Sequence, residues 1–172
     1  RCGGIGWHPP GVEAVVEVLM SSSKQGFYSR FRLTPNMFRL LMNCWPPFIG
    51  LRIHMEQIAP DWRHVRVRMK LGLRNKNFVG SHFGGGLFSM VDPYFMIMMI
   101  HQLDSDYLVW DKSARIDFIA PGRTTVYADF RYSEEQIEEV IRMTADGKKF
   151  EPTYAVDIVD TAGKLVARMA TY

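Results

Sequence analysis

Apolar and polar residues alternate in two neighbouring stretches of the chain. Residues 51–56 read Leu-Arg-Ile-His-Met-Glu, and residues 64–71 read His-Val-Arg-Val-Arg-Met-Lys-Leu, with Ala-Pro-Asp at 59–61 between them. A period of two with one polar face is typical of strands in an antiparallel sheet that is solvated on one side. The pattern therefore predicts two antiparallel strands joined by a turn.

Two helices, of which the second is expected on the surface, can be predicted from the residues at their ends. Thr34 and Pro35 suit the N-cap and the first helical position, and Pro46 stops the helix that follows them. Residues 133–136, Ser-Glu-Glu-Gln, have the capping-box pattern, and Gly147 ends the helix that they start.

A much more apolar helix is predicted at residues 84–103. Its most apolar part, Leu87–Ile100, is shorter than the roughly 20 residues that a membrane span needs, and Asp92 and Pro93 interrupt it. It is therefore predicted to be a buried helix. Pro93 cannot donate the helical hydrogen bond to the carbonyl group four residues earlier, so we expect a kink or a loosened turn beside Asp92.

Further strands are predicted at residues 107–119, 124–132, 150–159 and 165–171. One buried helix and about six strands imply an antiparallel sheet wrapped around that helix, which is an α+β layout.

Composition narrows the class of protein. The 172 residues suggest one domain, and 47% hydrophobic residues are enough for a real core. A net charge of +3 is too small to indicate a nucleic-acid partner. Cys2 and Cys44 form no disulfide framework, which favours a reducing, cytoplasmic setting. The five histidines and two cysteines lack the spacing of metal ligands, so no metal is expected.

The N-terminal region differs from the rest of the chain. It is rich in glycine and proline, and its apolar stretch carries two glutamates and lacks a small-residue cleavage site, unlike a signal peptide. We predict an N-terminal extension at residues 1–26 and a single domain at residues 27–172. Two interpretations of residues 1–19 stay open: a native segment, or an over-extended reading frame with its start at Met20.

Residues 77–92 carry the most informative chemistry. A polar loop leads through three glycines into the apolar run, in which Asp92 is the acid. Glycine lets another group approach the backbone, and a helix start presents unpaired N–H groups and the positive end of the helix dipole. An acid in apolar surroundings should have a raised pKa, which suits a general base. Such donors and such an acid are what polarising and attacking a carbonyl group requires.

These residues and the predicted layout resemble the hotdog-fold acyl-CoA thioesterases. In the phenylacetyl-CoA type, an Asn is followed by His-Gly-Gly and by a helix that carries Ser and then Asp. Here Asn77, Gly84-Gly85 and Phe88-Ser89-Met90-Val91-Asp92 fall at the matching spacings. The resemblance implies a hotdog fold, in which the sheet wraps around the long central helix.

Within this superfamily the chain is most similar to an uncharacterised bacterial thioesterase-like branch of the DUF4442 type. The shared residues are Asn-Phe-Val-Gly-x-His-Phe-Gly-Gly at 77–85, the segment 106–112 and Pro121-Gly122, and the similarity covers about residues 35–171. Residues 110–112, Trp-Asp-Lys, either line the pocket or form a strand-edge ion pair.

The resemblance assigns catalytic roles to five residues. Asp92 would activate water or attack the thioester, the N–H groups of Gly84 and Gly85 would bind the thioester oxygen, and Asn77 would orient water or the carbonyl group. His82 is one place earlier than the usual histidine, so its role is the least secure. The residues themselves leave structural roles open: a paired acid, close helix packing at the glycines, a turn asparagine and a core histidine.

A second set of residues is assigned to substrate binding. Phe83 replaces the usual histidine directly before the paired glycines, and Gly86 completes the glycine run. Arg74, Lys76 and Arg123 are candidates for the coenzyme A phosphates. Alternatively, Arg74 and Lys76 belong to a solvated face that continues the basic side of the strand at residues 64–71.

The predicted function is hydrolysis of an acyl-CoA thioester at a dimer-interface site. The hotdog resemblance implies a homodimer or homotetramer, in which Asp92 of one subunit faces the glycines of the other. No cofactor is expected beyond the coenzyme A of the substrate. The alternatives are a non-catalytic acyl-CoA-binding module and a 3-hydroxyacyl thioester dehydratase, which needs a histidine–acid pair.

Overall fold

The computed structural model describes residues 16–20, 33–103 and 106–171. The helices are α1 (Pro35–Cys44), α2 (Pro46–Leu51), α3 (Gly84–Val91), α4 (Tyr94–Gln102) and α5 (Glu134–Thr144). The strands are β1 (Val16–Met20), β2 (Ile53–Ile58), β3 (His64–Met69), β4 (Tyr107–Asp111), β5 (Arg115–Phe118), β6 (Val126–Arg131), β7 (Tyr154–Asp160) and β8 (Leu165–Thr171).

Six strands form one antiparallel sheet in the order β2-β3-β6-β7-β8-β5. The alternation of the sequence sets the two faces of β2 and β3: Ile53, Met55, Val65 and Val67 are buried on one side. The side chains between them are polar and lie on the other side, as a half-solvated sheet requires.

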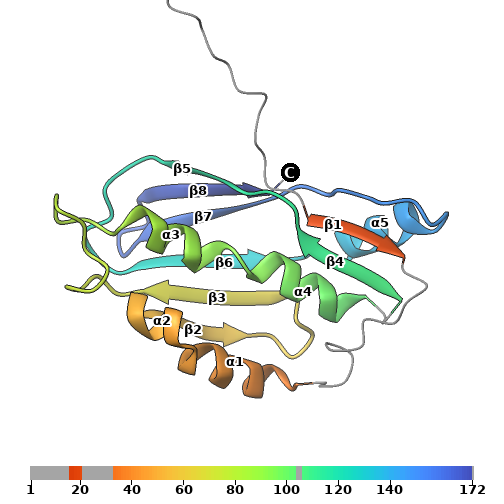
Figure 1. The fold of residues 1–172 in the computed structure, drawn as a ribbon, viewed down its shortest axis with the longest axis horizontal. Helices are drawn as coiled ribbons and strands as arrows, with labels where there is room; N and C mark the ends of the chain where they lie inside the picture. The colour runs from red at the N-terminus through yellow and green to blue at the C-terminus, as the bar shows by residue number, and fades with distance from the viewer. Residues whose placement is uncertain (1–15, 21–32, 104–105, 172) are drawn as a thin grey trace, which may run out of the picture.

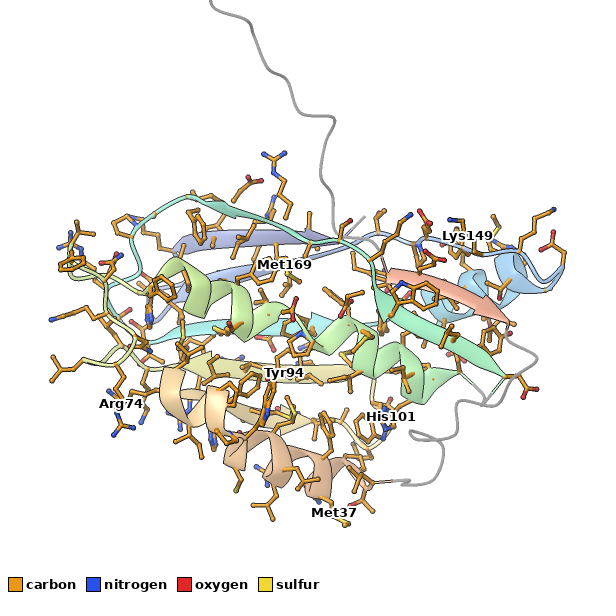
Figure 2. All side chains as sticks on the ribbon, in the orientation of Figure 1. Met37, Arg74, Tyr94, His101, Lys149 and Met169 are labelled. Atoms are coloured by element: carbon orange, nitrogen blue, oxygen red, sulfur yellow. The ribbon has the colours of Figure 1, made fainter. Side chains whose placement is uncertain are left out.

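Helices α3 and α4 lie along the buried face of the sheet (Figure 1). Tyr94 and Met169, which Figure 2 labels, are fully buried in the core between these layers. Gly86 brings α3 close to α2 and to the sheet, because a Cβ atom there would lie 3.4 Å from the side chain of Leu51 in α2 and 3.6 Å from the sulfur of Met69 in β3. The sheet wrapped around a central helical segment is the α+β hotdog fold that the sequence predicted.

The central helix is interrupted at the predicted place. α3 ends at Val91, Asp92 and Pro93 form a turn, and α4 begins at Tyr94. The missing N–H group of proline accounts for the interruption.

Two other predictions of element boundaries need correction. Residues 46–51 form helix α2 and not only the end of α1, because proline suits the first positions of a new helix. The single strand predicted at 107–119 is two strands, β4 and β5, and these belong to different sheets.

Part of the predicted N-terminal extension packs with the domain. β1 pairs with β4 in a two-stranded antiparallel sheet. Val16 and Val18 are fully buried in the same core as the central helices. Residues 16–20 therefore belong structurally with the domain, whereas the remainder of the segment 1–26 lies outside the described residues.

Candidate active site

The loop between β3 and α3 is held in place by a buried asparagine, Asn75. Its Nδ2 donates to the carbonyl oxygens of Leu51 at 2.6 Å and Lys70 at 2.9 Å. Its Oδ1 accepts from the backbone N–H of Gly72 at 2.8 Å. Phe83 N–H donates to the carbonyl oxygen of Asn75 at 2.8 Å. Asn75 was not among the predicted site residues, yet its hydrogen bonds position the loop from which α3 begins.

Asn77 shapes the tip of the same loop. Its Oδ1 accepts from the N–H groups of Val79 at 3.1 Å and Ser81 at 3.0 Å. Its Nδ2 donates to the hydroxyl of Ser81 at 2.9 Å and to the carbonyl oxygen of His82 at 3.3 Å. The turn role that the sequence left open is therefore present, and contact of Asn77 with a substrate stays a prediction.

The first turn of α3 presents unpaired backbone donors. The N–H groups of Gly86 and Leu87 both donate to the carbonyl oxygen of Phe83, at 2.9 and 3.1 Å. Within the described part of the chain, the N–H groups of Gly84 and Gly85 have no acceptor. Because the positive end of the helix dipole lies here as well, this turn can bind an anion or a polarised carbonyl oxygen.

A cavity of about 340 Å³ opens beside this turn. Asn77, His82, Gly84 and Leu87 line one side of it, and residues 118–122, which run from the end of β5 into the loop after it, line the other. The cavity therefore places the N-terminal turn of α3 opposite a loop that is distant in the sequence, which includes the predicted Pro121-Gly122 segment.

His82 lies in the wall of this cavity and is 3% exposed. Its Nε2 bonds the carbonyl oxygen of Thr124 at 2.8 Å, so this nitrogen carries the proton. The other ring nitrogen, Nδ1, is buried without a hydrogen-bond partner among the described residues. Burial lowers the pKa of His82 more than the Thr124 bond raises it, which keeps the ring neutral at pH 7. Nδ1 is therefore an unused acceptor, and a catalytic role of His82 stays a prediction.

Asp92 lies at the junction of α3 and α4, on an exposed part of this chain. No hydrogen bond or ion pair to its carboxylate is present in the described ranges. Loss of hydration from the surrounding protein raises its pKa, as predicted for this acid.

Asp92 does not line the cavity beside the glycines. Gly84 and Leu87 face that cavity, whereas Asp92 follows Gly85 by two helical turns, roughly 10 Å along the helix axis. The geometry thus separates the glycine donors from the acid within one chain.

Asp111, the last residue of β4, was not a predicted site residue. Burial, and secondly the charge of Asp92, raise its pKa to about 7. The predicted ion pair of residues 110–112 is present only for Lys112, whose Nζ lies 2.7 Å from Glu151 Oε1. An acid that ends an otherwise apolar strand was the available sequence signal.

The predicted coenzyme A cations are exposed. Arg74 and Lys76 extend from the β3–α3 loop, and Arg123 follows the loop that lines the cavity; Figure 2 labels Arg74 at the end of the molecule. Over the described residues none of the three forms an ion pair. By contrast, Arg66 and Arg68 on β3 bind acids of the sheet, which supports a structural role for that face.

The two apolar members of the predicted binding set differ in position. The Phe83 ring is 54% exposed and covers Gly85, where an added Cβ atom would lie 2.5 Å from it. Gly86 is buried against the sheet, so close packing explains it in this chain. Contact of either residue with a substrate stays a prediction.

The described residues contain no group of three His, Cys, Asp or Glu side chains that could hold a metal ion. In the same residues, no helix has both the length and the apolar character that crossing a membrane requires.

Comparison with known proteins identifies relatives by fold. A probable thioesterase from Pseudomonas aeruginosa, itself of unknown function, is 23% identical with a TM-score of 0.71, covering 80% of this chain and 92% of that one. A Haemophilus influenzae thioesterase is 13% identical with a TM-score of 0.57, covering 81% and 88%. Mouse thioesterase superfamily member 2 is 16% identical with a TM-score of 0.53, covering 79% and 92%.

A comparison with the curated proteins finds no match. The family is nevertheless shown by the sequence, because residues 35–172 match the domain of unknown function DUF4442. This range includes the glycine turn, the cavity, and Asp92 and Asp111, the two acids whose pKa is raised. The chain therefore belongs to the DUF4442 family, and its fold is similar to that of the thioesterases compared above.

Proposed function

We propose that this protein hydrolyses the thioester bond of an acyl-CoA. The observation that carries the proposal is the pair of free N–H donors of Gly84 and Gly85 at the start of α3, beside a cavity. Asp92, with its raised pKa, supplies the acid–base group that such a reaction needs. The thioesterases among the structural relatives have the same fold, which supports the choice of reaction.

The proposed reaction uses the glycine N–H groups and the carboxylate of Asp92. The glycine N–H groups bind the thioester oxygen and stabilise the negative charge that develops on it. Asp92 either takes a proton from the attacking water or attacks the carbonyl carbon itself. The exposed cations Arg74, Lys76 and Arg123 would bind the phosphates of coenzyme A, and the reaction needs no further cofactor.

We propose further that the site is completed by a second copy of the chain. Because Asp92 does not line the glycine cavity and lies two helical turns beyond Gly85, the acid of one protomer would serve the glycines of its partner. A homodimer, or a homotetramer built from such dimers, would then contain two equivalent sites per pair.

The function is tested by a steady-state hydrolysis assay of the purified protein over acyl-CoA esters of increasing chain length. Release of free thiol above the uncatalysed rate supports the proposal. Tight binding of acyl-CoA without turnover would instead identify a binding module. Dehydration of a 3-hydroxyacyl-CoA without thiol release would identify a dehydratase.

Hybrid dimers test whether two chains share the site. Asp92→Asn and Gly84→Pro chains are expected to be inactive alone. Unfolded and refolded together at equal concentration, they should recover about a quarter of the parent's activity, because half of the dimers are hybrids with one intact site out of two. A mixture that stays inactive, although mass spectrometry shows hybrids, would place the acid and the glycines in one chain.

A further inference from the structure

The loop between β3 and α3 carries apolar side chains that the candidate site does not use. Leu73 is 90% exposed, Val79 is 69% exposed and Phe78 is fully exposed. None of the three lines the cavity beside the glycine turn. Figure 1 shows that this loop projects at one end of the molecule, beyond the ends of the strands of the large sheet. We refer to Leu73, Phe78 and Val79 as the apolar tip.

The polar backbone groups of this loop bond to one another. The N–H group of Asn77 donates to the carbonyl oxygen of Ser81 at 2.8 Å, and that of Gly80 donates to the carbonyl oxygen of Asn77 at 3.1 Å. The N–H groups of Val79 and Ser81 both donate to Asn77 Oδ1. These donors are satisfied without water, which lowers the free-energy cost of moving the loop out of water.

The same loop carries unpaired positive charge. Arg74 and Lys76 are exposed, and neither forms an ion pair within the described ranges. Figure 2 shows Arg74 at the projecting end of the molecule. The sequence from residue 62 to residue 91 contains no Asp or Glu. No acid of the loop itself therefore neutralises these cations.

The neighbouring loop, which follows β5, adds to this charge. The two loops are joined by the N–H group of His82, which donates to the carbonyl oxygen of Gly122 at 2.9 Å. Arg123 is exposed and forms no ion pair among the described residues. The one acid in residues 115–125 is Asp117, which binds Arg115 at 3.0 Å. This end of the molecule therefore combines exposed apolar side chains with free cations.

A second exposed apolar surface lacks such cations. It lies on α1 and α2 and consists of Met37, Leu40, Leu41, Trp45 and Ile49. The only cation in residues 35–51 is Arg39, whose guanidinium donates to the carbonyl oxygen of Glu56 at 3.3 Å. This surface is therefore not complementary to an anionic partner, and it serves as an internal comparison for the apolar tip.

We propose that the apolar tip inserts into an anionic membrane surface, where Arg74, Lys76 and Arg123 bind lipid phosphates. Apolar side chains gain free energy on leaving water, and cations are attracted to an anionic leaflet. Stable attachment of a peripheral protein takes two such signals together. An isologous contact between two copies at this tip would instead set the same cations against each other. The proposal does not depend on thioester hydrolysis.

Sedimentation with lipid vesicles tests the attachment. The parent should bind vesicles of phosphatidylcholine mixed with phosphatidylglycerol much more tightly than vesicles of phosphatidylcholine alone, and added NaCl should weaken the binding. Phe78→Ser should lower the partition coefficient about tenfold, since an aromatic ring no longer leaves water. Arg74→Ala should lower it about fivefold on the mixed vesicles. Leu40→Ser, on the comparison surface, should bind like the parent.

Fluorescence quenching tests the insertion separately. Phe78→Trp keeps an aromatic ring at the tip and should bind the mixed vesicles like the parent. Lipids that carry bromine on their acyl chains should quench this added tryptophan. Leu40→Trp, which places the same reporter on α1, should gain no quenchable fluorescence over the parent. Thermal unfolding verifies that each variant is folded.

Four outcomes would overturn the proposal. The first is a parent that binds neither kind of vesicle, and the second is equal binding to both kinds. The third is an equal loss of binding in Leu40→Ser and Phe78→Ser, which would mean that the apolar tip is not the site of attachment. The fourth is a fall in molar mass of Phe78→Ser in light scattering, which would assign the tip to an interface between copies of the chain.

Discussion

Replacing Asp92 by asparagine or alanine is expected to lower kcat/KM for acyl-CoA hydrolysis by at least about 100-fold, since positioned acid–base groups commonly contribute that much. The fold should survive, because Asp92 is an exposed residue and its carboxylate makes no hydrogen bond or ion pair within the described residues. The measurement is a steady-state assay, with thermal unfolding to verify folding.

The sign of the pH dependence strengthens this prediction. Asp92 acts as an anion, so the parent's rate should fall as pH decreases through the raised pKa of this group. The residual rate of Asp92→Asn should not show this fall as pH decreases. Glu138→Gln on the exposed side of α5 removes the same charge far from the site and should change neither rate nor profile. Unchanged hydrolysis by Asp92→Asn would remove the acid from the mechanism.

Gly84→Pro should lower kcat by about 100-fold, because it deletes one backbone donor to the developing oxyanion. Gly84 is the first residue of α3, where proline is tolerated, and its N–H has no acceptor among the described residues. Phe83 before it has φ −65° and ψ 130°, a conformation compatible with a following proline. The substitution therefore removes a donor without removing a hydrogen bond of the fold.

Gly84→Ala is the matched control for that experiment. Its Cβ atom lies 3.0 Å from the exposed ring of Phe118, as the proline Cβ would, but the N–H is kept. Gly84→Ala should retain most of the activity. Equal losses in the two variants would mean that space, and not the N–H group, matters at this position. Full activity in both would exclude the Gly84 N–H as an oxyanion donor.

The sequence predicted the elements that local chemistry controls. The alternation in β2 and β3, the caps at Thr34 and Ser133 and the interruption beside Pro93 each depend on residues close in the chain. Prediction failed where one residue has two local effects. Pro46 stops α1 and is also the first residue of α2, and only the first effect was predicted. The bend that divides β4 from β5 depends on pairing with β1 and β8, which local patterns do not encode.

The candidate site likewise combines features that neighbouring residues determine with features that depend on tertiary packing. The spacing of Gly84, Gly85 and Asp92 was readable because one short segment carries all three. The raised pKa of Asp111 could not be predicted, because it comes from burial and from the charge of Asp92, 19 positions away in the sequence (111 minus 92). Likewise, only the fold determines that the tautomer of His82 is set by the carbonyl group of Thr124.

By itself, the sequence determined the α+β class, the buried and interrupted central helix and the glycine turn that precedes Asp92. These follow from hydrophobic period, capping and backbone chemistry, which act over a few residues. Only the tertiary structure decided that Asp92 does not line the glycine cavity, that β1 belongs to the core, and that burial and the charge of Asp92 raise the pKa of Asp111. Those facts depend on which segments pack together, and desolvation and charge act through space without regard to distance along the chain.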